Sequence, residues 1–366
     1  MTAGRAAVVE ADRRVVVSEV EYAEPGHGEV LVRLTATGLC HTDLGVLAGG
    51  IPFPVPGIIG HEGAGRVEKV GPGVREVGPG DAVLLSFTSC GLCDACASAH
   101  PAYCDTWLPR NLLGGMRGED SGGITRGGER LAGHFFGQSS FATHAIADER
   151  SVVRVAADAD LSVPAPLGCG VLTGFGSMWN VLDPGPTDIV AVYGAGAVGL
   201  SAVMAASLRT PAQLIAIDRV AARLDLAREL GATDTVDAAN DDVATRLADL
   251  TGGRGVTLGF DTTGHPGVAR TALEAAAARG TVLVCGAPPP GTEIAVDIQG
   301  ILTGKILRGV TMGDADPREL IPRLVALHAE GRLPLEKLEH RYTLDEITAA
   351  IDDMHHGRTV KPVIVY

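Results

Sequence analysis

Residues 188–209 read DIVAVYGAGAVGLSAVMAASLR, and this stretch predicts how the second half of the chain folds. DIVAVY is a short apolar run, typical of a strand that is buried on both faces of a sheet. From Ala197 onward the apolar side chains recur with helical spacing. The turn between them carries G-x-G-x-x-G as Gly194, Gly196 and Gly199. We therefore expect a strand, a tight glycine turn and a helix in direct succession.

The same alternation continues downstream. We expect a second strand over LIAIDR (214–219), followed by a helix over VAARLDLARELGA (220–232) that ends at Gly231. Further short strands are predicted at TDTVDA (233–238), VTLGFDTTG (256–264), GTVLVCGA (280–287) and ILRGVTMG (306–313), with a helix over VARTALEAAAARG (268–280). Such a βαβαβ series predicts an α/β fold with a doubly wound parallel sheet.

The glycine turn is a candidate dinucleotide site. Its glycines, with Val198 inside the motif, would let the backbone approach a pyrophosphate at a helix N-terminus, where unpaired N–H groups favour anions. Asp218 lies 24 residues after Gly194, close to the spacing expected for a ribose-binding acid. Its carboxylate would repel a 2′-phosphate, which favours NAD over NADP, although Arg219 and Arg223 could compensate. The alternative is a glycine-rich turn without a ligand.

The first third of the chain has a strand-and-turn pattern. Apolar and polar residues alternate over residues 5–10, 14–22, 29–38, 65–71, 81–87 and 141–155, with Gly/Pro clusters between the earlier runs. Residues 105–134 are rich in glycine without a clear period, which predicts a long loop. LGCGVLTGFGSMWNVL (167–182) predicts a connecting helix. Near the end we expect amphipathic helices over 317–331 and 345–357 and a strand over 360–366.

Length and charge exclude several classes of protein. The 366 residues suggest two domains, and the net charge of −14 argues against a nucleic-acid partner. No run of 18 apolar residues occurs, so no membrane span is expected. The start shows no apolar stretch after a basic region, so no signal peptide is expected. We therefore expect a soluble, cytoplasmic protein.

Four of the 7 cysteines are crowded into CGLCDACASAHPAYC (90–104), spaced C-x2-C-x2-C-x7-C. As thiolates, Cys90, Cys93, Cys96 and Cys104 can close on one tetrahedral Zn²⁺. Four protein ligands leave no position for a substrate, so this zinc would be structural and would fix a lobe at about 88–106. The alternative is four unrelated thiols in a loop.

The remaining cysteines pose a second question. Cys40 stands in GLCHTDL, His61 and Glu62 in GHEGAG, and Cys169 in PLGCGVLTG. One zinc held by two thiolates and one imidazole would keep a fourth position open. Singly, each residue also has an ordinary structural interpretation, and no spacing connects them. Cys285, on a presumed core strand, is interpreted as a small buried hydrophobe.

These motifs together resemble the zinc-dependent alcohol dehydrogenases of the medium-chain dehydrogenase/reductase family. The resemblance runs over essentially the whole chain and in the same order: GLCHTD (38–43), GHEGAG (60–65), the four-cysteine lobe, LGCGVLTG (167–174), YGAGAVG (193–199) and AID (216–218). HFFGQSSFATHAI (134–146) and GCGVLTGFG (169–176) look most similar to aryl-alcohol (benzyl-alcohol) dehydrogenases.

The resemblance implies a GroES-like catalytic domain (1–170 and 315–366) around a Rossmann NAD-binding domain (171–314). It makes Cys40, His61 and Cys169 ligands of a catalytic zinc. Glu62 would be a carboxylate near that metal, Asp43 would orient His61, and Thr42 would receive the substrate proton. It places His41 and Lys361 near the cofactor pyrophosphate and Thr173 near the nicotinamide. Family members form dimers and tetramers, so we expect a homodimer or a homotetramer.

One position departs from the family pattern. Many members carry a histidine three residues after the threonine, where it passes the proton to solvent, and here that residue is Gly45. We hypothesise that His41, or the ribose hydroxyl and water, ends the relay instead.

The expected reaction is hydride transfer between a primary alcohol, aromatic or allylic, and NAD, with two Zn²⁺ per chain. Aromatic residues in segments that could line an apolar pocket are Phe53, Phe87, Trp107, Phe135 and Phe136. The loop over 105–134 could shape its entrance. Alternatives are a thiol-dependent formaldehyde dehydrogenase, a biosynthetic C=C or C=N reductase, and a non-catalytic NAD-binding protein.

Overall fold

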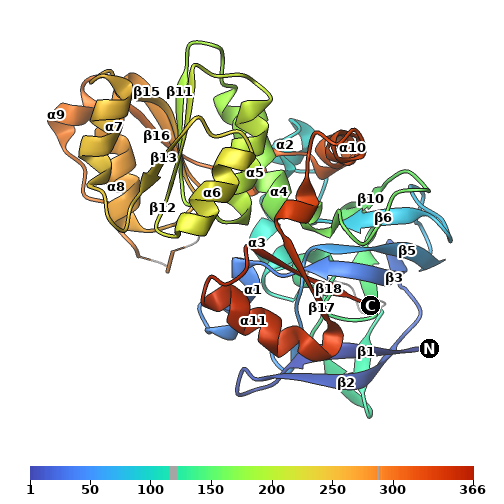
Figure 1. Cartoon of the computed structure of the whole chain (residues 1–366). Coiled ribbons are helices and arrows are strands. Elements are labelled where there is room, and N and C mark those ends of the chain that lie inside the picture. The colour runs from blue at the N-terminus through green and yellow to red at the C-terminus, as the bar shows by residue number, and fades with distance from the viewer. Residues whose placement is uncertain (115–121, 287, 290) are drawn as a thin grey trace. The chain divides into compact units, whose positions relative to one another are not determined.

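The computed structural model describes residues 1–114, 122–286, 288–289 and 291–366. The chain divides into two compact units (Figure 1). Unit 1 consists of Met1–Cys169 and Asp316–Tyr366, and unit 2 of Gly170–Ala315. Unit 1 is therefore built from both ends of the chain, and unit 2 from a continuous segment.

Unit 2 is organised around a parallel sheet. Its strands are β11 (Ile189–Tyr193), β12 (Gln213–Asp218), β13 (Asp234–Asp237), β14 (Val256–Asp261), β15 (Ala276–Val284) and β16 (Ile306–Gly309). They lie in the order β13-β12-β11-β14-β15-β16 with parallel pairing throughout. The sheet thus grows outward in both directions from β11, which confirms the predicted doubly wound α/β fold.

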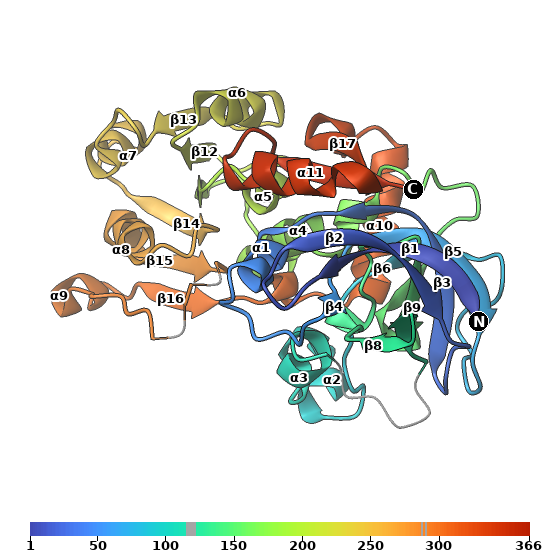
Figure 2. The ribbon, with the colours of Figure 1, turned by 90° about the horizontal axis from the view of Figure 1, so that it is seen from below.

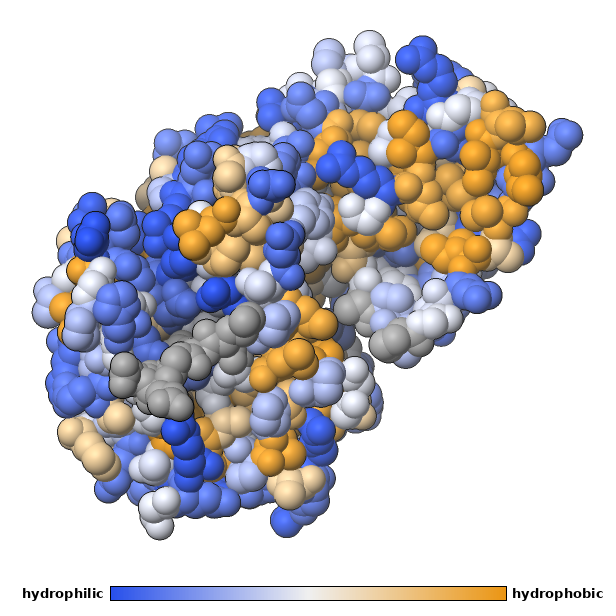
Figure 3. All heavy atoms as spheres, turned by 180° about the vertical axis from the view of Figure 1, so that it is seen from behind, coloured by the Kyte–Doolittle hydropathy of each residue, from blue (hydrophilic) through white to orange (hydrophobic). Residues whose placement is uncertain are grey.

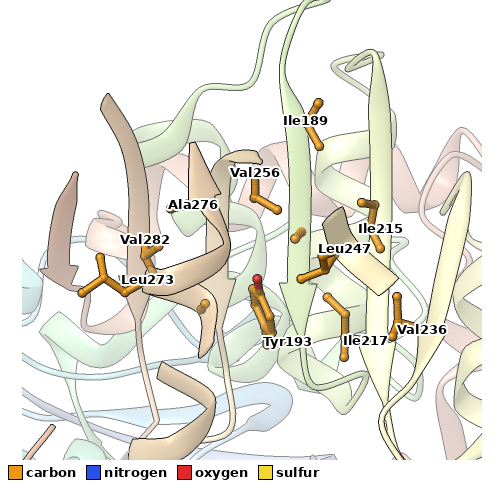
Figure 4. Close-up of a cluster of buried hydrophobic side chains, with 12 residues drawn as sticks. Ile189, Tyr193, Ile215, Ile217, Val236, Leu247, Val256, Leu273, Ala276 and Val282 are labelled. Atoms are coloured by element: carbon orange, nitrogen blue, oxygen red, sulfur yellow. The ribbon is translucent and has the colours of Figure 1, made fainter. Parts of the chain in front are cut away.

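Helices connect these strands and cover the sheet. They are α4 (Gly170–Gly176), α5 (Ala197–Ser207), α6 (Ala221–Glu229), α7 (Val243–Thr251), α8 (Pro266–Ala275) and α9 (Ile298–Ile301). Ile189, Tyr193 and Ile217 point from one face of the sheet into a buried cluster that includes Leu247 of α7 and Leu273 of α8 (Figure 4). Alternate residues of β11 therefore supply this layer of the core.

One element boundary differs from the sequence prediction. The helix expected over 268–280 ends at Ala275, and residues 276–280 belong to β15. Here the chain pairs Ala276 with Val256 and Thr281 with Leu258, with an irregularity between the two pairs. Pairing with β14 therefore overrides the helical propensity of the alanine run. Among the described residues, no helix is both long and apolar enough to cross a membrane.

Unit 1 is rich in strands. They are β1 (Thr2–Val9), β2 (Val15–Tyr22), β3 (Glu29–Gly38), β4 (Gly57–Ile58), β5 (Gly63–Val70), β6 (Ala82–Leu85), β7 (Ile124–Arg126), β8 (Glu129–Leu131), β9 (His144–Asp148), β10 (Val152–Arg154), β17 (Glu339–Thr343) and β18 (Lys361–Val365). One sheet has the order β4-β1-β2-β7-β8. The other has the order β10-β6-β5-β3-β18-β17, with β9 also paired to β3. The helices are α1 (His41–Leu47), α2 (Asp94–Ala97), α3 (Trp107–Asn111), α10 (Pro317–Ala329) and α11 (Ile347–His355).

Strand β3 positions the site described below. It pairs with β5, β9 and β18, and its apolar side chains lie in a buried cluster with those of β5, β6 and β9. It ends at Gly38, two residues before Cys40, and β5 begins at Gly63, two residues after His61. The antiparallel pair β3–β5 therefore brings these two candidate ligands to the same end of the sheet.

The sequence predicted a long loop over the glycine-rich segment 105–134, but the structure has regular elements there. The segment contains α3, and the β7–β8 hairpin extends the first sheet through pairing of β7 with β2. Figure 2 shows α2 and α3 as a lobe set apart from the strands of unit 1. Residues 115–121, within the predicted pocket entrance, lie outside the described residues.

The edge strand β17 contains a buried carboxyl group. The side chain of Glu339 is 3% exposed, and neither carboxyl oxygen has a hydrogen-bond partner among the described residues. Burial raises its pKa to about 8, against the opposing effects of the Arg341 guanidinium, 3.9 Å away, and of Lys361. Folded protein thus keeps this proton up to about pH 8, whereas the unfolded chain releases it above its ordinary value of 4.5.

We predict that this proton makes the fold less stable as pH rises from about 4.5 to about 8, because the unfolded chain then binds fewer protons. Glu339→Gln should remove this pH-dependent fall in the free energy of unfolding. At pH 8 its melting temperature should exceed that of the natural protein by roughly 2–4 °C for each ~1 kcal/mol by which the free energy of unfolding is higher. Thermal unfolding at pH 5 and pH 8 measures the difference. The exposed Glu330→Gln serves as the control, and an equal response of both variants would contradict the prediction.

Candidate active site

Four potential ligands from distant parts of unit 1 lie together. Cys40 precedes α1, His61 and Glu62 precede β5, and Cys169 is the last residue of unit 1 before α4. One ligand atom of each residue lies within 4.8 Å of the others. His61 and Glu62 are fully buried, and Cys169 is almost so. The structure therefore brings together the residues that spacing alone left unconnected.

Asp43 holds two of these segments in place. Its Oδ2 accepts a hydrogen bond from the backbone N–H of Cys40 at 2.9 Å. Its Oδ1 accepts one from the N–H of Gly60 at 3.2 Å and lies 3.0 Å from Nδ1 of His61. The carboxylate itself is fully buried. It thus fixes the orientation of the imidazole and directs Nε2 toward the thiols.

The donor set fits a metal ion. Nε2 of His61 is buried and has no hydrogen-bond partner among the described residues, which is costly for a polar atom. The pKa of the Cys40 thiol is held well below its usual range, first by a hydrogen bond from Cys169 and then by His61. Two sulfur atoms and one imidazole nitrogen are ligands that zinc prefers. Bound there, a metal would satisfy the otherwise unpaired nitrogen.

Glu62 has a partner that the sequence did not indicate. The Lys361 ammonium, only 1% exposed, lies 2.7 Å from Oε1 and 2.6 Å from Oε2 of Glu62. It also donates to the carbonyl of Leu39 at 2.9 Å. Burial raises the pKa of the Glu62 carboxyl to about 7, and the ammonium works against that increase. In this structure Lys361, expected near a pyrophosphate, is thus buried against a carboxylate of the ligand cluster.

Aromatic rings surround the imidazole. Phe136 stacks on His61 with ring centroids 4.4 Å apart, and Phe135 meets it edge-on at 5.5 Å. Phe53 packs on Phe135 at 5.2 Å, and Trp107 packs on Phe136 at 5.6 Å. Four of the five aromatic residues singled out in the sequence therefore form one cluster. Phe87 is also buried but makes no ring contact with it among the described residues.

Three further residues near Cys40 belong to α1. Thr42 places its Oγ1 3.8 Å from Cys40 Sγ. His41, the first residue of the helix, is exposed. At Gly45 a Cβ atom would lie 3.0 Å from Cδ1 of Ile51, so that side chain occupies space beside the helix where a larger residue would extend.

The four-cysteine lobe forms a second cluster of ligands. The sulfur atoms of Cys90, Cys93, Cys96 and Cys104 lie within 4.8 Å of one another. The N–H groups of Leu92 and Cys93 donate to Cys90 Sγ at 3.4 and 3.3 Å. These hydrogen bonds lower the pKa of the Cys90 thiol to about 6, although burial opposes them. The lobe can therefore present thiolates in a closed, four-sulfur arrangement.

The glycine turn of unit 2 is shaped for close backbone approach. Gly194 has φ +92°, and Gly199 packs so tightly that a Cβ atom there would lie 1.7 Å from the Gly194 carbonyl oxygen. A Cβ atom at Gly196, which precedes α5, would meet nothing within 4 Å. The N-terminus of α5 is thus open at Gly196, where a pyrophosphate would need room.

Four of the other predicted cofactor residues also lie in unit 2, whereas His41 and Lys361 belong to unit 1. The Asp218 carboxylate, at the end of β12, accepts hydrogen bonds from the N–H groups of Ala195 at 2.6 Å and Val220 at 2.9 Å. Val198 follows in the first turn of α5, and Arg223 is in α6. Thr173 is buried in α4, with Oγ1 4.0 Å from Sδ of Met312.

Comparison with known proteins agrees with this arrangement. Residues 26–157 match the family model described as alcohol dehydrogenase GroES-like domain, and residues 197–328 match the one described as zinc-binding dehydrogenase. Geraniol dehydrogenase of Castellaniella defragrans is 41% identical over 96% of this chain and 94% of its own length. S-(hydroxymethyl)glutathione dehydrogenase of Escherichia coli is 36% identical over 96% of each chain.

A solved structure is also similar throughout. Benzyl alcohol dehydrogenase from Acinetobacter calcoaceticus superposes with a TM-score of 0.94 and 37% identity, covering 100% of this chain and 99% of its own. The fold is thus that of a two-domain dehydrogenase. The chain belongs to the zinc-dependent alcohol dehydrogenases of the medium-chain dehydrogenase/reductase family.

We predict two zinc ions per chain in the purified protein, one at each cluster. Cys169→Ser should lower the count to about one by removing a thiolate from the cluster around His61. Cys285→Ser is the matched control, because Cys285 belongs to neither cluster. Elemental analysis of the dialysed proteins gives the counts. Two zinc ions retained by Cys169→Ser, or one lost from Cys285→Ser, would contradict the assignment.

Proposed function

We propose that this protein oxidises primary alcohols, aromatic or allylic, with NAD⁺ as the hydride acceptor, and reduces the matching aldehydes. The carrying observation is the cluster of Cys40, His61 and Cys169, which offers three zinc ligands beside a buried aromatic surface. Three protein ligands leave a coordination position for a substrate, whereas the four-cysteine lobe does not. The first cluster is therefore proposed as catalytic and the lobe as structural.

In the proposed reaction, the residues around the cluster bind the metal, move the substrate proton and exclude water. When bound, zinc supplies the Lewis acidity that eases loss of the alcohol proton, and NAD⁺ supplies the site that accepts the hydride. Two thiolates and a neutral imidazole balance the metal charge. Thr42, whose hydroxyl lies beside Cys40, accepts the substrate proton, and the exposed His41 or water passes it to solvent because position 45 is glycine. Phe135 and Phe136 keep water away from the imidazole.

The choice of NAD rests on Asp218. Its carboxylate lies at the end of β12, directly beside the glycine turn to which it is hydrogen-bonded. A negative charge there favours ribose hydroxyls and disfavours a 2′-phosphate. The open position at Gly196 would accept the pyrophosphate.

The substrate class rests on the aromatic cluster and on two relatives. The rings packed around His61 make the surroundings of this cluster apolar, which would suit an aryl or allylic group. The relatives named for geraniol and benzyl alcohol have such substrates in their names. A second candidate is thiol-dependent oxidation of formaldehyde, favoured by the similarity to S-(hydroxymethyl)glutathione dehydrogenase.

We predict fast NAD⁺ reduction at 340 nm with benzyl alcohol, cinnamyl alcohol or geraniol, and slow reduction with ethanol or with NADP⁺. Thr42→Val should lower kcat by about 10²–10⁴-fold because proton transfer is lost, while Thr42→Ser keeps the hydroxyl and most of the rate. Turnover restricted to formaldehyde plus glutathione would favour the second candidate. No alcohol oxidation by protein holding two zinc ions would contradict the proposal.

We also propose that two copies of the chain pair through β16 in a homodimer, or in a homotetramer built from such dimers. Strand β16 is the edge of its sheet, and all of its residues are exposed. Exposed apolar side chains gather here: Val296, Ile298, Leu302, Ile306 and Leu307. Figure 3 shows apolar surface at the right-hand end of the molecule, where α9 and β16 lie. An apolar edge strand is a template for pairing with another chain.

Leu307→Lys should therefore shift the protein toward monomers in size-exclusion chromatography with light scattering, because a buried charge at the pairing edge is costly. Val16→Lys on β2 is the matched control, since both side chains belong to residues that are 39% exposed. Dissociation by both variants, or by neither, would contradict a specific interface at β16.

A further inference from the structure

Residues 134–140 form a strained, buried segment beside the proposed catalytic cluster. His134, Phe136 and Ser139 have φ values of +70°, +54° and +60°, a region that side-chain-bearing residues rarely adopt. Each of these three residues is at most 8% exposed. Hydrogen bonds hold the segment: Ser139 Oγ donates to the carbonyl of Ile58 at 2.5 Å and accepts from the N–H of Phe135 at 2.9 Å. Such strain persists only where the surroundings enforce it.

Gln138, at the centre of this segment, is fully buried, and its side-chain amide makes three hydrogen bonds. Its Nε2 donates to the carbonyl of His61 and to the carbonyl of Ser86, both at 2.9 Å. Its Oε1 accepts from the N–H of Gly63 at 3.0 Å. The amide thus binds the backbone on both sides of Glu62.

The Gln138 amide lies where strands β5 and β6 stop pairing. Strands β5 and β6 pair through Ala64–Leu84, Gly65–Val83 and Arg66–Ala82, and the ladder stops there. Continued pairing would bring Gly63 against Leu85 and Glu62 against Ser86. Gln138 instead inserts between the two chains and satisfies the backbone groups that the ladder leaves unpaired. The two strands can therefore separate beyond Ala64 while the N–H of Gly63 and the carbonyls of His61 and Ser86 keep hydrogen-bond partners.

The same network reaches the third ligand. Ser86 Oγ donates to the carbonyl of Gly168 at 2.6 Å, and Gly168 directly precedes Cys169. The peptide groups beside His61 and beside Cys169 are therefore connected through Gln138 and Ser86. The ring of Phe136, two residues before Gln138, stacks on the His61 imidazole from the same segment.

We propose that Gln138 is a positioning residue for the zinc site: it sets the separation of the His61 and Cys169 backbones and so the geometry in which the ligands meet. The inference rests on the proposed function, because it assumes that Cys40, His61 and Cys169 hold zinc. Among the described residues, the side chain of Gln138 hydrogen-bonds to backbone groups and to none of the three ligand side chains. Its effect passes through the peptide groups that it binds.

The test follows the loss of zinc to a chelator from the purified protein. Gln138→Met keeps the side-chain length and removes all three hydrogen bonds. We expect it to release one of the two zinc ions about 10-fold faster, the lower end of the range for groups that orient metal ligands. The second zinc should be released at the natural rate, and KM for NAD⁺ should stay unchanged. Ser86→Ala removes only the contact to Gly168 and should accelerate release by a smaller factor.

Asn111→Leu is the matched control. Asn111 is also a fully buried amide of unit 1 with three backbone hydrogen bonds, to Thr88 N–H, the Thr88 carbonyl and the Trp107 carbonyl. It should lower the melting temperature without accelerating release of the zinc that Cys169→Ser removes. Equal release from Gln138→Met and the natural protein, with a fall in melting temperature like that of Asn111→Leu, would overturn the inference. A natural protein without zinc at this cluster would instead overturn the proposed function.

Discussion

The ligand cluster of unit 1 depends on the buried carboxylate of Asp43. It accepts hydrogen bonds from two backbone N–H groups, of Cys40 and Gly60, and faces Nδ1 of His61. A buried charge is tolerated only when such donors surround it. Loss of one partner of a buried hydrogen bond costs about 1–3 kcal/mol, so the segments before α1 and before β5 cannot separate cheaply. The carboxylate thereby holds Cys40 and His61, which the β3–β5 pairing brings near each other, in fixed positions.

A second constraint is that the charged groups of the ligand cluster are buried and therefore need partners of opposite charge. Lys361 reaches Glu62 from β18, close to the C-terminal end of the chain, and places an ammonium beside a carboxylate near two thiols. The aromatic rings around His61 lower the local polarity and strengthen these interactions. Unit 1 is built from both ends of the chain, and the site needs both, because the N-terminal part supplies the ligands and the C-terminal part supplies Lys361. Unit 2 needs no such long-range assembly, because its glycine turn and first helix are adjacent in sequence.

Local patterns explain which features the sequence could predict. The parallel sheet follows from short apolar strands alternating with helices, and Gly194, Gly196 and Gly199 mark the turn because strand, turn and helix are contiguous. The four-cysteine lobe follows from ligands spaced within fifteen residues. By contrast, the run after Ala275 has high helical propensity and becomes a strand only because β14 lies beside it. The β7–β8 hairpin was missed because its glycines carry no strand signal.

Contacts between distant residues explain what the sequence could not predict. No spacing connects Cys40 and His61 with Cys169, and only the family resemblance suggested that they meet. The Glu62–Lys361 contact joins residues 299 positions apart, and Gln138 acts on peptide groups 52 and 77 positions away. Such contacts depend on tertiary pairing and leave no periodic signature.

The most direct test of the account is zinc K-edge X-ray absorption on the Cys93→Ser/Cys96→Ser protein, in which the lobe should no longer hold metal. We expect one zinc per chain with two sulfur neighbours at about 2.3 Å and two nitrogen or oxygen neighbours at about 2.0–2.1 Å. Such a shell is that of Cys40, Cys169, His61 and one further ligand at the open position. A folded protein with no zinc, or with a zinc bound by four sulfur atoms, would contradict the assignment of this cluster as the catalytic centre.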